Sequence, residues 1–319
     1  MGLTLKDELL KRGYVISTQT TKDGKPYREF VSPSGARMTK VGMYYMYPFT
    51  SEKAMAISKD KMQAYELAKA TGIIIPAGVQ TSDVAVARKF LDTYKQVIVK
   101  PHNRSGGSGL SVDITTDAQL GKAMERATYH GEAPLIQQQF IGEELRLTVI
   151  NGEVYSVILR QSPRIVGDGT RTVQQLIEAE NVARKDLIFP YLAYPQLTAD
   201  NIDPAFLTSQ TIPEKGETVE LNKTTMIRNG ASFYGVTNLV HPSYIEIAKR
   251  LAAKLDAGLL AVDLMVVDFR APASDTNYIF LEFNTSPSMI VYSSLRGGDQ
   301  PPVAEKVVDM IDSYSHSKG

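Results

Sequence analysis

The sequence contains no cysteine among its 319 residues. This absence excludes disulfides, thiolate zinc sites and cysteine nucleophiles together, and it fits a reducing compartment. An excess of charge is also absent, because 35 Lys and Arg residues balance 35 Asp and Glu residues. A neutral chain has no overall attraction for nucleic acid or anionic membranes, so a site for a polyanion must be a local cluster of cations.

Long apolar runs and a targeting segment are absent as well. Apolar stretches such as residues 259–262 are far shorter than the ~20 residues that a membrane helix requires. The first residues are amphipathic and acidic, without the apolar centre of a signal peptide. With 43% hydrophobic and 22% charged residues, the chain is typical of a folded protein with one large domain or two coupled ones. We therefore expect a cytoplasmic protein without membrane or nucleic-acid partners.

Mixed helix and strand patterns predict an α+β fold. Ser58 is the predicted N-cap of a helix that runs to Ala70, and Asn151-Gly152 between two apolar runs predicts a β-hairpin. His241 and Pro242 mark the start of a long helix. Further strands are predicted at residues 14–18, 27–31, 73–75, 96–100, 110–114, 135–139, 260–268 and 278–283. Further helices are predicted at 3–12, 83–91, 117–130, 172–180 and 301–313, with long loops at 186–215.

The segment from Pro101 to Gly109 is rich in Gly and Ser and lies between two predicted strands. Its backbone N–H groups can turn toward one point, which suits phosphate oxygens, and Lys100 precedes it. A plain flexible hairpin loop is the alternative. The segment lacks the Gly-Lys-Ser/Thr of a Walker A loop, and no helix follows it as in a Rossmann fingerprint.

A second candidate cation, Lys61, lies in the predicted helix after Ser58. Ser58 and Lys61 also match the Ser-x-x-Lys motif of penicillin-binding enzymes. That motif is short, and the Lys-Thr-Gly and Ser-Asp-Asn boxes that accompany it are absent. A serine acylase is therefore disfavoured.

Acidic and amide side chains late in the chain form a candidate metal site. Glu282 and Asn284 are two residues apart and hence on one face of a strand. Asp263 lies in an apolar strand, where a carboxylate is costly unless it is paired or binds a metal. Two carboxylates and an amide oxygen suit Mg²⁺ that also holds phosphates. The alternative is a salt bridge to a nearby Lys or Arg.

The order and spacing of five features resemble the ATP-grasp superfamily. These features are Lys61, the strand that ends at Lys100, the Gly-rich loop, Asp263 and Glu282-Phe283-Asn284. Residues 139–146 are similar to the hinge "E-E-F-I-x-G-x-E-x-R". Residues 160–172 are similar to "R-x-P-A-x-V-x-G-D-G-x-x-T" of cyanophycin synthetases and bifunctional glutathione synthetases. Residues 281–289 resemble their "E-x-N-x-x-P-x-M", and the similarity covers roughly residues 40 to 311.

The resemblance implies an ATP-grasp fold, in which two α+β subdomains hold ATP between them. It divides the chain into a short N-terminal segment (1–50), a subdomain with a Gly-rich lid (51–139) and a subdomain with the metal and substrate sites (140–319). Three groups of ligands are implied. Phosphates would contact Lys61, Lys100, Ser105, Gly106, Gly107, Ser108 and Gly109. Adenine and ribose would contact Gln138, Gln139, Phe140, Ile141 and Glu144, and Mg²⁺ or Mn²⁺ would contact Asp263, Glu282 and Asn284.

Enzymes of this kind activate a carboxylate as an acyl phosphate, which an amine then attacks. The resemblance thus implies an ATP-dependent carboxylate–amine ligase for amino acids, small peptides or a peptide tail. It is also compatible with a homo-oligomer. Phosphoryl transfer requires charge neutralisation and alignment more than covalent help. Guanidinium groups suit the carboxylate or the transferring phosphoryl group, with a surface ion pair as the alternative for each. The candidates are Arg146, Arg160, Arg164 and Arg228.

Several positions depart from the pattern. Gln138 and Gln139 stand where relatives carry acids, Arg164 replaces a usual Asn, and residues 221–232 lack "R-x-x-x-N-x-S-T-G-G". Only about 50 residues precede the ATP-binding part, so neither polymer synthesis nor complete glutathione synthesis is expected. The alternative functions are a kinase with the same phosphate machinery and a nucleotide-binding module that no longer ligates.

Overall fold

A six-stranded sheet forms the centre of the computed structural model, which describes residues 4–41, 44–102, 109–128, 131–189, 192–293 and 295–316. The strand order is β17-β16-β9-β10-β15-β18, and all neighbours are antiparallel except β15 and β18. The strands are β9 (Glu143–Ile150), β10 (Glu153–Gln161), β15 (Ser232–Gly235), β16 (Leu259–Val266), β17 (Tyr278–Asn284) and β18 (Gly297–Gly298). The strands predicted at residues 260–268 and 278–283 are present as β16 and β17, and they pair with each other.

Local signals explain how this sheet forms. Asn151 and Gly152 both adopt positive φ, 49° and 80°, which is the conformation that a tight hairpin between β9 and β10 requires. His241 caps helix α8 (Pro242–Leu255) by accepting a hydrogen bond from the Ser243 N–H. Both predictions are confirmed.

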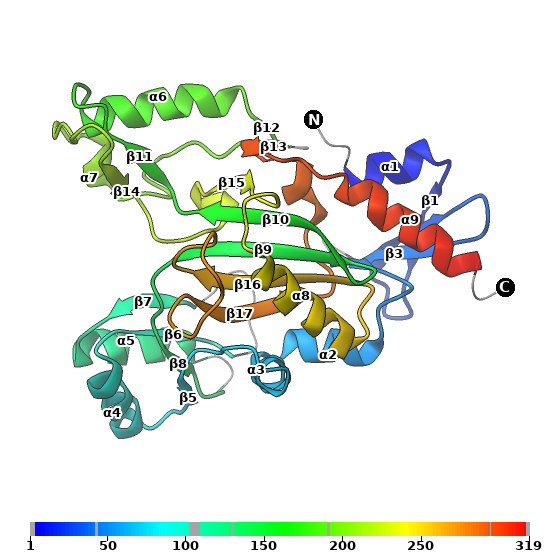
Figure 1. The fold of residues 1–319 in the computed structure, drawn as a ribbon, viewed down its shortest axis with the longest axis horizontal. Helices are drawn as coiled ribbons and strands as arrows, with labels where there is room; N and C mark the ends of the chain where they lie inside the picture. The colour runs from blue at the N-terminus through cyan, green and yellow to red at the C-terminus, as the bar shows by residue number, and fades with distance from the viewer. Residues whose placement is uncertain are drawn as a thin grey trace.

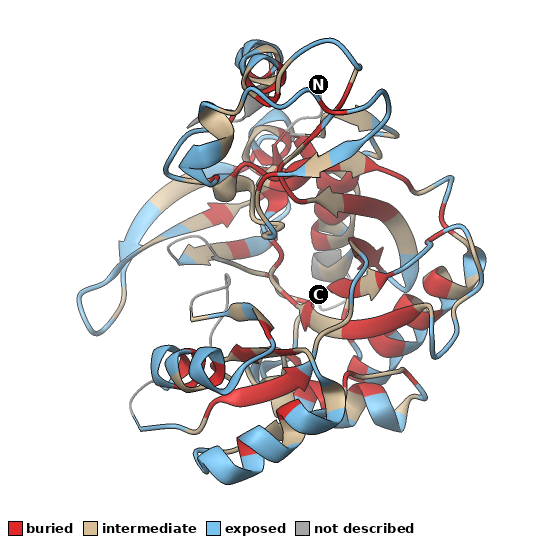
Figure 2. Ribbon diagram, turned by 90° about the vertical axis from the view of Figure 1, so that its left-hand side faces the viewer, coloured by how far each residue is buried: buried red, intermediate tan, exposed pale blue. Residues whose placement is uncertain are grey.

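The two faces of the large sheet have different cores. On one face, Leu145 and Leu147 of β9 pack against Ile247 and Leu251 of α8, which lies across the sheet in Figure 1. On the other face, Ile158 packs with residues of α9 (Val303–His316) and of the N-terminal sheet. Because successive side chains of a strand point to opposite faces, β9 and β10 send alternate residues into each core. Figure 2 shows the strands of the large sheet as mostly buried and many of the connections as exposed.

A smaller sheet forms the lower left part of Figure 1. Its order is β5-β8-β6-β7, all antiparallel, with β5 (Gly78–Gln80), β6 (Val97–Lys100), β7 (Ser111–Ile114) and β8 (Leu135–Gln138). Helices α4 (Val84–Tyr94) and α5 (Asp117–Ala127) share its core. Asp83 caps α4, and Thr116 forms a capping box with Gln119 at α5.

The N-terminal residues form a third antiparallel sheet, β1 (Val15–Thr20), β2 (Pro26–Val31), β3 (Arg37–Val41) and β4 (Tyr44–Met46). Helix α1 (Leu5–Lys11) lies beside α9 (Figure 1), and Arg12, directly after α1, forms ion pairs with Asp309 and Asp312 of α9. Phe30 and Met38 enter the core of the large sheet. The N-terminal segment is therefore packed onto the central sheet.

Two sequence predictions between these sheets are wrong. Residues 52–70 form two helices, α2 (Glu52–Lys59) and α3 (Lys61–Ala70), and Ser58 lies inside α2. Asp60 caps α3, because its carboxylate reaches the N–H groups of both Met62 and Gln63 (2.9 and 3.2 Å). Residues 73–75 are not a strand. Ile74 shares only single hydrogen bonds with β17, including its carbonyl with the Phe280 N–H (2.8 Å), and β5 begins at Gly78.

The connection between β10 and β15 forms a small unit with its own core, at the upper left of Figure 1. Thr172 caps α6 (Val173–Lys185) within the predicted helical region. The remaining short elements are β11 (Arg164–Val166), β12 (Ile188–Phe189), β13 (Leu192–Ala193), α7 (Pro204–Leu207), β14 (Thr218–Glu220) and the 3-10 helices η1 (Ile227–Asn229) and η2 (Met289–Ser293). Within the described residues, no helix is long and apolar enough to cross a membrane.

Candidate functional site

A buried ion pair lies at the centre of the large sheet, on the face opposite α8. Asp263 of β16 stands in register with Arg146 of β9 and with Glu282 of β17. The guanidinium of Arg146 donates to both Asp263 oxygens, at 2.7 and 2.6 Å. The two side chains are only 8% and 2% exposed. This bidentate geometry is the strongest form of an arginine–carboxylate contact.

The environment keeps Asp263 ionised. Burial by itself raises the pKa of this carboxyl, but the charges of Arg146 and Arg160 outweigh burial and lower its pKa below the ordinary value. Nη1 of Arg160 lies 3.7 Å from Asp263 and also donates to Glu144. The second oxygen of Glu144 accepts from Thr225. Both carboxylate oxygens of Glu144, the predicted ribose contact, therefore have protein partners.

The predicted phosphate lysine Lys61 lies next to two of the predicted metal ligands. Its Nζ is 4.0 Å from Oε2 of Glu282, whose Oε1 accepts from the Asn284 amide at 3.4 Å. Burial lowers the pKa of Lys61, and Lys100 lowers it further, whereas Glu282 raises it. The Lys61 side chain is 13% exposed and that of Glu282 is 34% exposed. The start of α3 thus brings a cation to the end of β17.

The donor chemistry of Asp263, Glu282 and Asn284 fits a hard cation such as Mg²⁺. For Asp263, the salt-bridge alternative is present in the structure, because Arg146 contacts both of its oxygens. Each carboxylate oxygen has a second lone pair, so this contact still leaves acceptor capacity. Within the described residues, no three His, Asp or Glu side chains gather around one point. A metal here would depend on the Asn284 oxygen, and metal binding stays a prediction.

Lys100 lies at the end of β6 in the small sheet. Its Nζ donates to the Tyr65 hydroxyl at 3.1 Å and lies 5.7 Å from the centre of that ring. The predicted lid residues Ser105, Gly106, Gly107 and Ser108 lie outside the described residues. Gly109 has a φ of 77°, and a Cβ there would approach Pro101 Cγ to 2.9 Å. Position 109 therefore requires glycine where the loop rejoins the sheet.

The predicted adenine hinge connects the small and the large sheet. The Gln139 side chain accepts from the Asp113 N–H (2.7 Å) and donates to the Asp113 carboxylate (2.8 Å), so its amide is engaged within the protein. Gln138 is exposed, Phe140 is half-buried, and Ile141 is 72% exposed. At Gly142, a Cβ would lie 2.6 Å from the Val266 carbonyl oxygen, because the chain passes close to the end of β16.

The four candidate arginines do not form one cluster. Arg146 and Arg160 lie on the Asp263 face, whereas Arg164 pairs with Glu143 (2.7 Å), which precedes Glu144 and points to the α8 face. Arg228 is exposed in η1, where it contacts the Met226 sulfur. Among the four, Arg146 and Arg160 share Asp263 as a partner.

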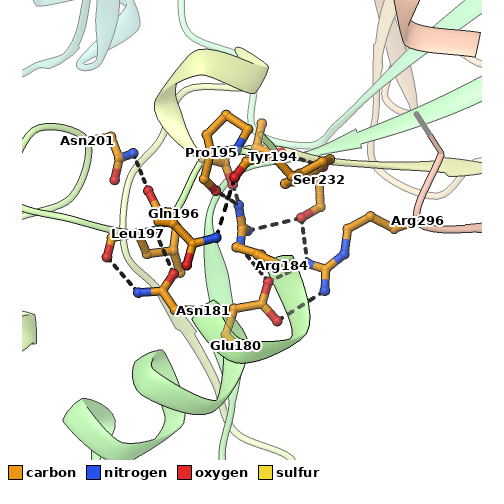
Figure 3. Close-up of polar contacts among 12 residues, drawn as sticks. Glu180, Asn181, Arg184, Tyr194, Pro195, Gln196, Leu197, Asn201, Ser232 and Arg296 are labelled. Carbon is orange, nitrogen blue, oxygen red and sulfur yellow. Dashed lines mark hydrogen bonds and ion pairs between the residues drawn. The ribbon is translucent and has the colours of Figure 1, made fainter. Parts of the chain in front are cut away.

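A second arginine network was not found from the sequence. Arg184 of α6 and Arg296 share the carboxylate of Glu180, with contacts of 2.7 Å to Arg184 Nε and 3.1 Å to Arg296 Nη2 (Figure 3). Arg184 also donates to the carbonyls of Pro195 (2.9 Å) and Gly230 (2.8 Å). Glu180 and Arg296 border a cavity of about 410 Å³. The i,i+4 spacing of Glu180 and Arg184 is visible in the sequence, but Arg296 is 116 residues away.

Comparisons with known proteins agree with the resemblance inferred from the motifs. Residues 60–181 match the family described as "Prokaryotic glutathione synthetase, ATP-grasp domain". The chain is 24% identical over 267 residues to the glutathione biosynthesis bifunctional protein of Clostridium perfringens, covering 80% of this chain and 34% of that protein. It is 23% identical over 260 residues to the cyanophycin synthetase of Trichormus variabilis, covering 79% and 29%. The chain thus spans about a third of the length of these relatives.

Solved structures share the fold. A bifunctional glutathione synthetase from Pasteurella multocida superposes with a TM-score of 0.67 at 20% identity, covering 97% of this chain and 44% of that chain. D-alanyl-alanine synthetase A from Vibrio cholerae superposes with a TM-score of 0.54 at 13% identity, covering 98% and 92%. Together with the α+β architecture, these similarities show that the chain has the ATP-grasp fold, and residues 60–181 match the ATP-grasp domain of prokaryotic glutathione synthetases.

Proposed function

We propose that this chain is an ATP- and Mg²⁺-dependent carboxylate–amine ligase. One observation carries the proposal: Lys61 of α3 lies beside Glu282 and Asn284 at the end of β17, next to the buried Asp263–Arg146 pair. Within an ATP-grasp fold, this arrangement offers a cation for phosphate oxygens beside oxygen ligands for a metal ion. The similar proteins support the same reaction class, because they are named for the synthesis of glutathione, cyanophycin and D-alanyl-alanine.

In this proposal, the chain neutralises and aligns the phosphates. Lys61, Lys100 and the residues Ser105 to Gly109 contact phosphate oxygens, and Gln138 to Ile141 border the adenine. Glu282, Asn284 and the free acceptor capacity of Asp263 would hold Mg²⁺, which would supply further neutralisation of the phosphate oxygens. Phosphoryl transfer depends mainly on such positioning and charge stabilisation.

Two arginines are assigned to the acyl-transfer steps. A carboxylate oxygen of the substrate attacks the γ-phosphorus of ATP, and ADP leaves. The amine then attacks the acyl carbon, phosphate leaves, and the amine loses a proton. Arg160, whose Nε is buried without a partner in the described residues, is placed to bind an oxyanion of the substrate. Arg146 holds Asp263 in position and is thus a positioning residue.

The substrates in this proposal are an amino acid, a small peptide or a peptide tail, and an amine. No nucleic-acid or membrane partner is part of it. Arg164 has no assigned role in the reaction, because it pairs with Glu143 on the α8 face. Arg228 stays a predicted contact for an oxyanion of the substrate, three residues after Thr225, which hydrogen-bonds to Glu144.

The proposal is tested by measuring ADP release from ATP and Mg²⁺ with a matrix of carboxylates and amines, and by mass spectrometry of the products. A ligase releases ADP only when both substrates are present and yields a product that has lost the elements of water. A kinase releases ADP with the carboxylate or another acceptor alone and yields a phosphorylated product. A binding module binds ATP without releasing ADP under any condition. Either of the last two results contradicts the proposal.

A further inference from the structure

A pocket of about 280 Å³ lies between the N-terminal sheet and the segment that follows Asn284. Lys40 of β3, Tyr45 of β4, and Arg28 of β2 border it from one side, and Ser288 and Met289 border it from the other. Lys6 of α1 completes its cationic wall. Elements that are more than 240 residues apart in the sequence therefore share one cavity.

The three cations of this pocket have no acidic partner. All 35 Asp and Glu residues belong to the described part of the chain, and none of them forms an ion pair with Lys6, Arg28 or Lys40 there. The nearby acids are engaged elsewhere, Asp7 at the N-cap Thr4 and Glu29 with Arg37. Burial lowers the pKa of Lys40, and the charges of Arg28 and Lys6 lower it further. An anion in the pocket would relieve this mutual repulsion.

The walls also suit the carbon chain of an organic anion. Nζ of Lys40 lies 5.0 Å from the centre of the Tyr45 ring, so the cation is held over an aromatic face. Met289 and Leu5, both buried, contribute apolar surface. The volume accommodates a group of side-chain to amino-acid size, which favours a carboxylate on a short aliphatic chain.

The pocket is structurally joined to the candidate functional site. The Ser286 hydroxyl donates to the Tyr45 carbonyl at 2.7 Å, two residues after Asn284. Tyr292, in the same short helix η2 as Met289, shares a 2.6 Å hydrogen bond with Thr148. Thr148 lies on the same face of β9 as Arg146. A molecule held in the pocket is therefore anchored by the segment that directly continues the predicted metal-binding strand.

We propose that Lys6, Arg28 and Lys40 form a subsite for a second carboxylate of the substrate, so that the enzyme selects an acidic amino acid or an acidic peptide over its amide. The preference between substrates in the reaction rests on the proposed ligase function. The binding of a carboxylate in the pocket does not depend on that function. The N-terminal sheet thereby acts as a specificity element of the site.

The kinetic test compares glutamate with glutamine, and aspartate with asparagine, as substrates in the ADP-release assay. The wild-type protein is expected to prefer the acid by at least ~10-fold in kcat/KM, as one charge-assisted contact contributes about that factor. Lys40→Met keeps the aliphatic stem and should abolish most of this preference through KM, with kcat changed less than about two-fold. Arg28→Gln should act in the same direction. An unchanged preference in both variants overturns the inference.

A matched control and a binding experiment separate this inference from the proposed function. Lys25→Met removes an equal charge from the exposed β1–β2 turn and should leave the preference unchanged. Binding of glutarate and of its monoamide is measured by calorimetry without ATP. If glutarate binds more tightly than its monoamide and this difference depends on Lys40, the subsite is supported. A failure of every substrate pair to release ADP would then count against the ligase proposal alone. Equal binding of the two probes, or no loss of glutarate binding in Lys40→Met, overturns the subsite.

Discussion

Two buried arginine networks lie on opposite faces of the large sheet and differ in what their arginines hold. In the Asp263 network (Arg146, Asp263, Arg160 and Glu144), the arginines contact side chains. In the Glu180 network (Glu180, Arg184 and Arg296), Arg184 also donates to two backbone carbonyls and so connects α6 to the Pro195 and Gly230 segments (Figure 3). Burial and ion pairing are similar in the two networks, so these properties alone do not identify a functional site.

The neighbours of each network make the difference. Glu282 is the register partner of Asp263, and Lys61 lies beside Glu282, so the Asp263 network adjoins half-buried groups that can meet a ligand. In the Glu180 network, Glu180 and Arg296 border the cavity of about 410 Å³, but Arg184 itself ends in two backbone carbonyls and Ser232. We therefore expect changes in the first network to reduce turnover, and changes in the second to reduce stability.

The largest effect is expected for Asp263→Asn. The change leaves the buried Arg146 without its counter-charge, which typically costs about 3–5 kcal/mol of folding free energy. It also removes a predicted metal ligand, so ADP release should fall below detection. Urea unfolding and the ADP assay measure the two effects. A variant with wild-type stability and turnover would contradict the role of Asp263 in both respects.

Glu282→Gln is expected to affect turnover alone. Its side chain is 34% exposed and lies 4.0 Å from Lys61, so its loss should change stability by less than about 0.5 kcal/mol. Removal of a metal-ligating charge should reduce ADP release by at least ~100-fold. The matched control is Glu153→Gln on β10, three strands away from β17 in the same sheet, which removes an exposed ion pair with Lys249 and should retain full turnover. Unchanged turnover in Glu282→Gln would exclude the metal assignment.

Arg184→Met is expected to show the opposite pattern. Two backbone carbonyls lose their donor in a site where Arg184 is 1% exposed, and Oε1 of Glu180 keeps only its contact with Arg296, so unfolding free energy should fall by about 3 kcal/mol. Turnover per folded molecule at low temperature should stay within about two-fold of wild type. A selective loss of turnover without loss of stability would show that the Glu180 network belongs to the reaction site, and would remove the contrast between the networks.

The smallest effect is expected in the pH dependence of stability. The folded-state pKa of Asp263 is below its ordinary value of 3.8, so its pairing stabilises the fold fully above that value. This contribution is lost as the pH falls through the folded-state pKa. The stability difference between wild type and Asp263→Asn should therefore be constant from pH 7 to pH 5 and narrow below about pH 4, as measured by urea unfolding. A difference that is independent of pH down to pH 2 would contradict the ionised state of Asp263.

Much of the fold could be predicted because its signals are local. The Asn151-Gly152 turn, the His241 cap and the apolar strands around Asp263 depend on neighbouring residues, and all three predictions hold. The prediction of a helix start at Ser58 is wrong because two capping signals compete. Asp60 offers its carboxylate to N–H groups of the same stretch, and it caps α3. The strand predicted at residues 73–75 is wrong because apolar character alone does not distinguish a strand from an extended segment with isolated hydrogen bonds.

The chemistry of the candidate site was determined by the sequence, and its assembly by the tertiary structure. The order of Lys61, Lys100, Asp263 and Glu282-Phe283-Asn284 was sufficient to indicate the ATP-grasp superfamily, because residue types and spacing are properties of the chain. The register of β9, β16 and β17 decided that Arg146 meets Asp263 and that Arg164 lies on the other face. A shift of one residue in strand register moves every side chain of the strand to the opposite face of the sheet. No local pattern specifies the register between strands that are more than a hundred residues apart.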